Sequence, residues 1–539
     1  MNIFTNADVE IAAIKQVLRR RRKAGDTMSL LTTIVNKFKK AVKTLDKSVK
    51  IEDVINQAIV SSAMKGALNL WGQMYENKAY WLHEPTLEDP SRVTSLGLPA
   101  FIASEKARTV TLEMKSEVTA PGENDEPTTN ERASFINDQY QKHVISNIRK
   151  QLEYGIAKGG LVIKPYPIID EDISKSQFAF DYIQADGFFP IAFDSSGRMT
   201  EAAFIQRKTD IKHVYTRLEH HKLERNTVTI TNRAFKNDIG QLKNLKNLSD
   251  LGREIPLTSV PEWEDIEPLQ SVENVNRLLF AYFKMPQANT IDTYSPLGVS
   301  GYSRAVDLIK DADKQYSRLL WEFEGGELAI DVDRTAMTEQ PYYNEDGILK
   351  TKLAMSSLQQ RLFRTTSIDQ SIGDTYNVFS PALRDNSLIN GLNEILKRIE
   401  DVTALSRGTI SDTNLDAKTA TEIISTKQRS YDDNKDIQTA LQKTLEDVVY
   451  IMDVYCTLYN ITSQGEYAVS FDWDDSIITD KDEETSRKLL LVDKGLMTKI
   501  DFVMWYYGMT RKKATAYLKE IETEQLQAMQ ISLMNDLAV

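Results

Sequence analysis

Residues 387–460 read SLINGLNEILKRIEDVTALSRGTISDTNLDAKTATEIISTKQRSYDDNKDIQTALQKTLEDVVYIMDVYCTLYN, and this stretch decides the fold. Its first part repeats apolar residues at intervals of four and three, at Leu388, Leu392, Ile395, Ile399 and Val402. A repeat near 3.5 residues is typical of a helix that packs along another helix. Arg407 places a cation in the last turn, and Gly408 can adopt the left-handed conformation that commonly ends a helix, so we expect the helix to stop there.

A polar loop over residues 408–416, GTISDTNLD, follows this helix and has little to bury. Asp416 can cap a second helix over 417–460, which contains neither Pro nor Gly and would span about 60 Å. The first half of that helix is polar, and its second half carries an apolar stripe. Because the loop's backbone groups need water or another partner, we expect the loop to project into an aqueous passage.

Composition limits the class of protein. The 539 residues are too many for one core, so several lobes are expected. No apolar run reaches the ~18 residues of a membrane span, and the N-terminus lacks a signal peptide's charge-then-apolar order, so we expect a chain made in the cytoplasm with no membrane partner. The net charge of −12 argues against a protein that grips nucleic acid along its whole surface. The single cysteine, Cys456, excludes a disulfide framework and is expected to be a buried small residue.

Weakly patterned helices precede an α/β region. A helix over 9–23 ends in the basic run RRRRK at 19–23, which fits either a solvated helix end or a contact with nucleic acid or an anionic surface. Further on, residues 99–107 and 145–157 are predicted as helices, and 110–114 and 161–164 as strands. The two glycines at 159 and 160 are interpreted as a turn rather than a phosphate-binding loop.

Short strands dominate residues 178–235, with a hairpin turn at DSSG, 194–197, so this region is predicted to form an antiparallel sheet. Three of the five histidines, His213, His220 and His221, fall in it. Acidic or cysteine partners at metal-ligand spacing are missing, so we interpret the three as solvated strand residues.

A second helix with a narrow stripe, residues 303–324, is the expected partner of 387–407. The insertion between them should contain a strand near 328–332, a turn at 344–347, a short helix at 353–360 and a strand at 376–379, and should form a docking tip. A strand at 467–473 is expected to return to the earlier sheet. Three short helices follow at 483–494, 499–507 and 511–522, with turns at Gly495 and Gly508 and a frayed tail over 525–537.

Catalytic motifs are missing from the sequence. The dipeptide Gly-Lys does not occur, which excludes a phosphate-binding P-loop, and G-x-S-x-G, H-E-x-x-H, C-x-x-C and G-x-G-x-x-G do not occur either. The acidic stretch at 473–484 fits a loop and a helix cap better than a metal site. We therefore expect no catalysis, no cofactor and no metal.

Several stretches, in this order along the chain, resemble the portal protein of tailed bacteriophages, in particular the type found in long-tailed phages of Gram-positive hosts. They are WGQMYENKAYW (71–81), AKGGLVIKPY (157–166), DYIQADGFFPIAFDSSGRMTEAAF (181–204), YTRLEHHK (215–222), SRAVDLIKDADKQYSRLLWEFEGG (303–326) and EDVTALSRGTISDTNLDAKTATEII (400–424). The likeness extends over most of the chain, from about residue 71 to 520, and its weight comes from the ordered set.

The resemblance implies an α+β subunit of portal type that assembles as a ring, usually dodecameric, at one capsid vertex of the virion. Its expected parts are an N-terminal helical segment (1–70), an α/β wing (71–299), two stem helices (300–325 and 384–407), a small α/β clip (326–383), a tunnel loop (408–417), a long helix with a returning wing strand (418–480), an α-helical crown (481–525) and a C-terminal tail (526–539).

The resemblance also implies a DNA channel for genome packaging, retention and ejection, without enzymatic activity. Its implied partners are double-stranded DNA in transit, the terminase large subunit, a head-completion (adaptor) protein that leads to the tail connector, and the major capsid and scaffolding proteins. The tunnel-loop residues would be Gly408, Thr409, Ile410, Ser411, Asp412, Thr413, Asn414, Leu415 and Asp416. By position, the basic residues that could face the lumen are Lys397, Arg398, Arg407 and Lys418. The clip docking surface would include Glu327, Asp331, Asp333, Tyr342, Tyr343, Asn344, Glu345 and Asp346.

Two alternatives stay open at this point, an enzyme with an unrecognised site and a DNA-binding regulator. The helices at 499–507 and 511–522 meet at Gly508 and could form a helix-turn-helix, with Arg511, Lys512 and Lys513 opening a recognition helix. Such a chain would be a DNA-binding regulator, although its long acidic framework argues against that function.

Overall fold

The computed structural model describes residues 49–536, apart from 56–59, 85–91, 122–127, 196–197, 240–249, 334–337, 345–346, 355–362, 367–375, 413–419 and 474–480. The basic run at 19–23 and the helices predicted before it and up to residue 48 lie outside the described residues. Helices and strands both contribute substantially, which confirms the α+β class. The chain divides into two compact units, one of Met1–Ser61 with Gly187–Leu278 and one of Ser62–Asp186 with Leu279–Val539.

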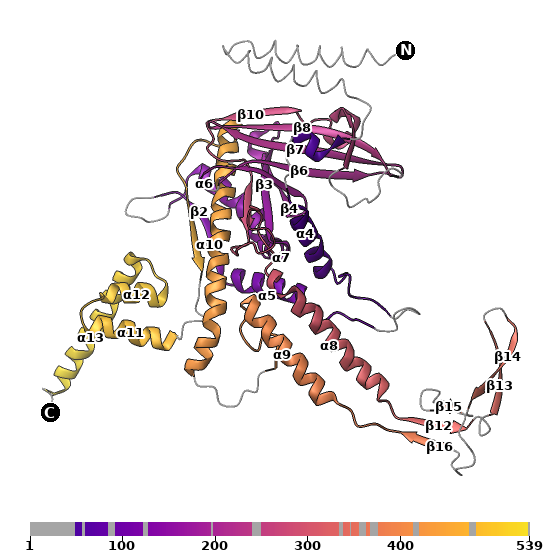
Figure 1. The fold of residues 1–539 in the computed structure, drawn as a ribbon. Helices are drawn as coiled ribbons and strands as arrows, with labels where there is room; N and C mark the ends of the chain where they lie inside the picture. Colours follow the sequence, from indigo (N-terminus) through magenta and orange to yellow (C-terminus); the bar gives the residue numbers. More distant parts are fainter. Residues whose placement is uncertain are drawn as a thin grey trace, which may run out of the picture. The chain divides into compact units, whose positions relative to one another are not determined.

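The first unit is an antiparallel sheet whose seven described strands run in the order β1-β9-β8-β7-β6-β5, with β10 paired to β8 (Figure 1). Its hairpins follow from local chemistry: Arg225 and Asn226 both have positive φ between β7 and β8, as a two-residue type I′ turn requires. The elements are β1 (Val49–Lys50), α3 (Ile51–Ile55), β5 (Phe188–Phe193), β6 (Met199–Thr209), β7 (His213–Glu224), β8 (Thr227–Asp238), β9 (Asp250–Ile255), η5 (Leu257–Ser259), η6 (Pro261–Trp263) and β10 (Leu269–Glu273).

The sheet predicted over 178–235 is confirmed for β5 to β8, and the backbone of Asp194 bonds that of Arg198 across the predicted hairpin turn. The prediction of solvated histidines is wrong for His221, whose side chain is 1% exposed. Its Nε2 bonds the Glu219 carboxylate at 2.6 Å and its ring meets Phe204 edge-on. A carboxylate partner within the sheet makes burial of the imidazole tolerable, and single-residue patterning does not reveal that partner.

The second unit is centred on the small antiparallel sheet β11-β3-β4, which packs against α7 and α10. The turn into β3 is the predicted glycine turn. Gly159 has φ +83°, and a Cβ there would come within 2.6 Å of the Val299 backbone, so only glycine fits. The elements are α4 (Ser62–Tyr75), α5 (Leu98–Thr111), β2 (Met114–Thr119), α6 (Glu131–Gln139), the π-helical η2 (Tyr140–Ile145), α7 (Ser146–Lys158), β3 (Gly160–Ile168), η3 (Ile173–Lys175), β4 (Gln177–Gln184) and β11 (Ala281–Lys284).

Two strand predictions are corrected in this unit. Residues 110–111 continue α5, and the strand predicted at 110–114 begins only at Met114 as β2. The returning strand, β17 (Ala468–Trp473), pairs with β2 and not with the larger sheet. The first error is a misplaced boundary between a helix and a strand, and the second concerns pairing between distant segments, which a period-2 pattern does not specify.

The longest element in the described part of the chain is α10 (Ala420–Leu458), whose 39 residues correspond to about 60 Å of helix (Figure 1). The predicted apolar second half is confirmed, because Leu441, Leu445, Val448 and Met452 are fully buried. Cys456 is also buried as predicted, and burial raises the pKa of its thiol to about 12.

The remaining elements are a short 3-10 turn, two helices that flank an insertion of strands, and three C-terminal helices. They are η7 (Ser303–Ala305), α8 (Val306–Gly325), β12 (Ala329–Asp333), β13 (Thr338–Tyr343), β14 (Leu349–Ala354), β15 (Phe363–Thr366), β16 (Tyr376–Phe379), α9 (Asp385–Thr403), α11 (Lys481–Asp493), α12 (Lys499–Tyr507) and α13 (Arg511–Asp536). The helix predicted at 511–522 is longer than expected, since α13 continues through the predicted tail to Asp536. The helix predicted at 353–360 begins inside β14, and its remainder lies outside the described residues.

Candidate functional site

The helices α8 and α9 lie side by side, as their narrow stripes predict (Figure 1). Where α8 ends and α9 begins, the Arg384 guanidinium donates to both oxygens of Glu322, at 3.1 and 2.7 Å, and the Arg384 backbone N–H adds a third bond at 3.0 Å. This pairing holds the pKa of Glu322 at about 2. The two ends of the insertion are therefore joined at its neck.

A buried carboxylate fixes α8 to the segment before α5. Asp313, 2% exposed, accepts from the indole Nε1 of Trp81 at 2.9 Å and from the backbone N–H of Leu96 at 2.8 Å. One turn along, Ser317 Oγ accepts from the Thr94 backbone at 2.8 Å. Burial raises the pKa of Asp313 even though both bonds favour its charged form. These contacts orient α8 relative to the rest of its unit.

The helix α9 stops four residues before the predicted end. Thr403 is its last residue, and Ala404 takes the left-handed conformation with φ +57°. Gly408 does have the predicted positive φ, 90°, but it lies within the loop and not at the cap. The early stop places Leu405 in the interior, 7% exposed, and a buried apolar side chain there outweighs the cost of a left-handed alanine.

Glu400 organises the first part of the predicted tunnel loop. Its carboxylate is fully buried and accepts from the backbone N–H groups of Gly408 at 3.3 Å, Ile410 at 2.7 Å and Ser411 at 2.9 Å. The Ser411 hydroxyl donates to the same carboxylate at 2.7 Å. Backbone N–H groups that converge on one anion form a nest, and here the anion is part of the preceding helix.

A second contact extends this anchor to Asp412. The Asn393 side chain donates to the Asp412 carbonyl at 2.8 Å and accepts from the Asp412 N–H at 2.7 Å. The N–H groups of Gly408, Ile410, Ser411 and Asp412 and the Asp412 carbonyl therefore find their partners on α9. Projection of the loop into an aqueous passage stays a prediction. Of the other predicted tunnel-loop residues, Thr413, Asn414, Leu415 and Asp416 lie outside the described residues, as does the candidate lumen residue Lys418.

The remaining candidate basic residues differ in their partners. Arg407 forms a two-point ion pair with Asp401, at 3.1 and 2.8 Å, which lowers the pKa of Asp401. Lys397 bonds Glu394 at 2.7 Å. Arg398 is exposed and makes no hydrogen bond or ion pair with a described residue. Arg398 is thus the candidate most available to an anionic partner.

The insertion carries the predicted docking residues on and beside β12 and β13. Tyr343 is 72% exposed and Tyr342 40%, and Glu327 is also exposed. Asn344 closes the predicted turn, accepting from the Ile348 backbone at 2.7 Å. Asp331 and Asp333 belong to β12, without a description of their side chains, and Glu345 and Asp346 lie outside the described residues. The sheet order β15-β12-β16 and the β13–β14 hairpin are the framework that carries these residues.

The described residues contain neither a metal-binding cluster nor a membrane span. No group of three or more His, Cys, Asp and Glu side chains in the described ranges is arranged to hold a metal ion. Within the same ranges, no helix is both long and apolar enough to cross a bilayer. The residues of the helix-turn-helix alternative, Arg511, Lys512 and Lys513, are exposed on the first turn of α13, after a left-handed Gly508.

Sequence reasoning missed Glu400, Asn393 and the pair Glu322 and Arg384. A charged residue on an amphipathic helix ordinarily faces solvent, so a single sequence gives no sign that Glu400 points inward. The only hint is its position directly after Ile399, at the edge of the apolar stripe.

Comparison with known proteins completes the description of the site. A scan against family models matches residues 70–525 to the family described as phage portal protein, SPP1 Gp6-like. A search of curated proteins finds no match. The matched span contains the α8–α9 pair, the insertion, the Glu400 anchor and α10, and it agrees with the resemblance seen in the sequence. The chain belongs to the SPP1 Gp6-like family of phage portal proteins.

Proposed function

We propose that twelve copies of this chain form a closed ring at one vertex of the capsid, and that the phage genome passes through the channel of this ring. Family membership itself implies a structural role, an oligomeric ring and association with the capsid. The subunit number, the vertex and the roles in packaging, retention and ejection are the proposal.

The observation that carries the ring is the incomplete burial of the helical stripes. The α8 stripe is buried at Ile309 and Ala312 but is exposed at Phe323, 44%, and the neighbouring Trp321 is 65% exposed. On α9, Ile399 is buried whereas Val402 is 38% exposed. Pairing of α8 with α9 therefore leaves large apolar side chains in solvent, and neighbouring copies would cover them.

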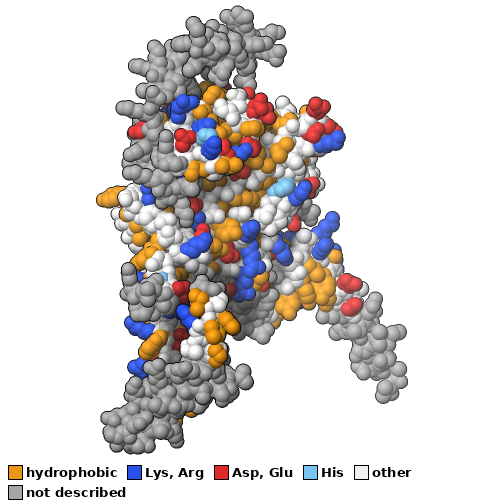
Figure 2. Space-filling view, turned by 90° about the vertical axis from the view of Figure 1, so that its right-hand side faces the viewer, with side chains coloured by type: hydrophobic (Ala, Val, Ile, Leu, Met, Phe, Trp, Pro, Cys, Tyr) orange, Lys and Arg blue, Asp and Glu red, His pale blue; other side chains and the backbone are white. Residues whose placement is uncertain are grey.

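The charge distribution suits transit of DNA rather than tight binding. The chain carries a net charge of −12, and acidic and basic side chains are interspersed on the face shown in Figure 2. Affinity for duplex DNA grows with the number of phosphates that a protein neutralises. A channel with few unpaired cations, such as Arg398, would let the genome move.

Docking of the packaging terminase and later of the head-completion protein is assigned to the insertion, the clip of the proposed subunit. Exposed tyrosines are enriched at protein interfaces, and Tyr342 and Tyr343 occupy successive positions on β13. The wing, stem, crown and tunnel-loop boundaries are proposed as the sequence predicts them, except that the second stem helix ends at Thr403. The DNA-binding regulator has only the exposed cations of α13 in its favour, and we do not propose it.

Imaging of the purified protein tests the ring directly. Negative-stain electron microscopy should show rings with a central hole. A protein that stays monomeric at micromolar concentration, with its apolar helix faces in solvent, would contradict the proposal.

Deletion of residues 409–415 tests the loop. Rings should still form, while packaging or retention of full-length DNA in assembled particles should fail. Replacement of the same seven residues by a Gly/Ser linker is the matched control, because it keeps the length of the loop and removes its side chains. Normal genome filling in the deletion variant would refute the role of the loop in retention.

A further inference from the structure

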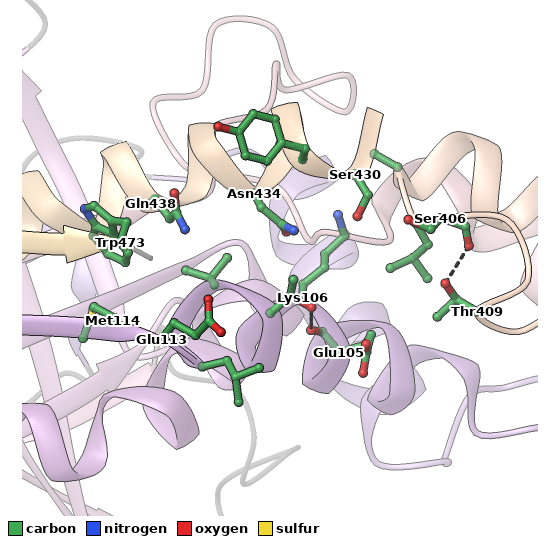
Figure 3. A pocket seen from close by; sticks show the side chains of 16 residues that line it. Glu105, Lys106, Glu113, Met114, Ser406, Thr409, Ser430, Asn434, Gln438 and Trp473 are labelled. Carbon is green, nitrogen blue, oxygen red and sulfur yellow. Dashed lines mark hydrogen bonds between the residues drawn. The ribbon is translucent and has the colours of Figure 1, made fainter. Parts of the chain in front are cut away.

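A cavity of about 200 Å³ opens in the second unit between α5, the chain that leads into β2, the residues after α9, and α10 (Figure 3). Trp473, at the end of β17, closes one side. The volume is below the ~300–1,000 Å³ of pockets that enclose drug-sized ligands, so the space suits one side chain rather than a cofactor. The described residues of this chain leave it open.

The charges in the cavity wall do not cancel. Lys106 is almost fully buried and is paired with Asp433 of α10. Glu105 accepts two bonds from Arg108, at 3.0 and 2.7 Å. Glu113, in contrast, makes no hydrogen bond or ion pair with a described residue, so its carboxylate is left as one uncompensated negative charge.

The opposite wall of the cavity contributes a side-chain amide whose oxygen also lacks a hydrogen-bond partner among the described residues. Gln438 is 9% exposed, and its buried Oε1 has no hydrogen-bond partner among the described residues. Figure 3 shows the amide end of Gln438 and the carboxylate of Glu113 approaching the cavity from α10 and from the β2 side. The amide can rotate so that its oxygen faces the cavity, and a buried carbonyl without a donor is unfavourable.

The chemistry that satisfies this wall is a planar cation with several donors. A guanidinium pairs with a carboxylate through two parallel N–H groups, has further donors for an amide oxygen and stacks on an aromatic ring such as Trp473. A lysine ammonium is a point charge and gains less from a carboxylate, an amide and an indole arranged around one space.

We propose that the cavity receives an arginine side chain from a second copy of this chain. The inference rests on the ring proposed above, in which each copy presents one surface to one neighbour and a different surface to the other. The rim supports such a contact, because Leu112 beside the cavity is 55% exposed in a single copy. The inserted side chain would touch α10 and the residues after α9 together, so contact between copies would bear on the base of the 408–416 loop.

Photo-cross-linking tests the source of the occupant. Leu112 is replaced by p-benzoylphenylalanine, and unlabelled and ¹⁵N-labelled proteins are mixed and assembled before irradiation. Mass spectrometry should find cross-links that join a light copy to a heavy copy, at a segment that contains an arginine. Cross-links confined to one isotope, or to segments without arginine, overturn the inference.

Charge reversal tests the chemistry. Glu113→Lys should lower the yield of cross-links between copies at least tenfold, and Glu113→Gln severalfold. Glu117→Lys, an exposed residue of β2 that lies four positions further along the chain and outside the cavity, is the matched control and should leave the yield unchanged. Replacing the mapped arginine by glutamate should restore cross-linking to Glu113→Lys.

Equal yields from Glu113→Lys, Glu113→Gln and the control would refute the proposed socket, that is, the cavity as an electrostatic binding site for an arginine side chain. Imaging of the same samples separates this failure from that of the ring. Rings that form without cross-links at Leu112 reject the socket alone, whereas a wild-type protein that forms no rings rejects the proposed function.

Discussion

Two buried charged side chains, Glu400 and Arg132, hold the two ends of the segment that runs from the loop through α10, and they do so with opposite chemistry. Glu400 accepts from backbone N–H groups that follow α9, all within 11 residues of itself in the sequence. Arg132, 2% exposed, donates to the carbonyls of Asp453, Thr462 and Ser463, more than 320 residues away.

The two side chains differ in how far apart in the sequence the joined residues lie, more than in the strength of their hydrogen bonds. Arg132 also bonds the side chains of Asp453 and Thr457, so one guanidinium satisfies five acceptors at the end of α10 and joins that end to α6. Glu400 joins a loop only to its own helix. We therefore expect the base of the loop to open as a local event, while the end of α10 opens only when its unit unfolds.

Arg132→Met should have the largest effect. It removes five hydrogen bonds and leaves the Asp453 carboxylate and three carbonyls without their donor, so a loss of about 3–5 kcal/mol in the free energy of unfolding is expected. Urea denaturation followed by circular dichroism measures it. Arg108→Met, an exposed residue whose ion pair among the described residues is with Glu105, is the control and should change stability by no more than about 0.5 kcal/mol. Similar losses in the two variants would remove the distinction between the buried and the exposed arginine.

Glu400→Gln should have a smaller and local effect. The amide keeps one acceptor but loses the charge that three N–H groups share, at a cost of about 1.5–3 kcal/mol. Hydrogen exchange of the amides at 408–411 should accelerate by roughly 10- to 100-fold, with little change elsewhere. Glu394→Gln, an exposed position on the same helix, serves as the control. Faster exchange throughout α10 would show that the base of the loop and the helix open together.

The sequence predicts the elements of this fold better than the contacts that organise its site. The 3.5-residue stripes of α8 and α9, the apolar half of α10 and the cap glycines Gly495 and Gly508 are local signals, and the structure contains each of them. Glu400 and Arg132 are not predictable in this way, since their roles depend on which backbone groups arrive from elsewhere. The pairing of β17 with β2 escaped prediction for the same reason.

The ion pair of Glu322 with Arg384 at the neck of the insertion, here called the clasp, offers a pH-dependent comparison with Glu400. Arg384 holds the pKa of Glu322 at about 2, below the ordinary 4.5. Between these two pH values the unfolded chain therefore binds more protons than the folded chain. The clasp should therefore contribute its full stability above pH 4.5 and lose it as the pH falls toward 2. Hydrogen exchange at the start of α9, after correction for the pH dependence of the intrinsic exchange rate, should accelerate over that range in the wild type. In Glu322→Gln the acceleration should be present already at pH 6 and should change little on acidification.

Arg407→Gln should have the smallest effect and decides whether a surface ion pair, in addition to Glu400, holds residues 408–411 in place. Arg407 is 47% exposed, so solvent screens its pair with Asp401 and the loss should stay below about 1 kcal/mol. The pKa of Asp401 should rise toward its ordinary value, because the bond from Arg407 is the main cause of its depression. Exchange at 408–411 should remain close to wild type. If exchange accelerates as much as in Glu400→Gln, the ion pair of Arg407 with Asp401 also holds these residues in place. Salt should then weaken the attachment, since the exposed ion pair is screened by salt and the buried Glu400 is not.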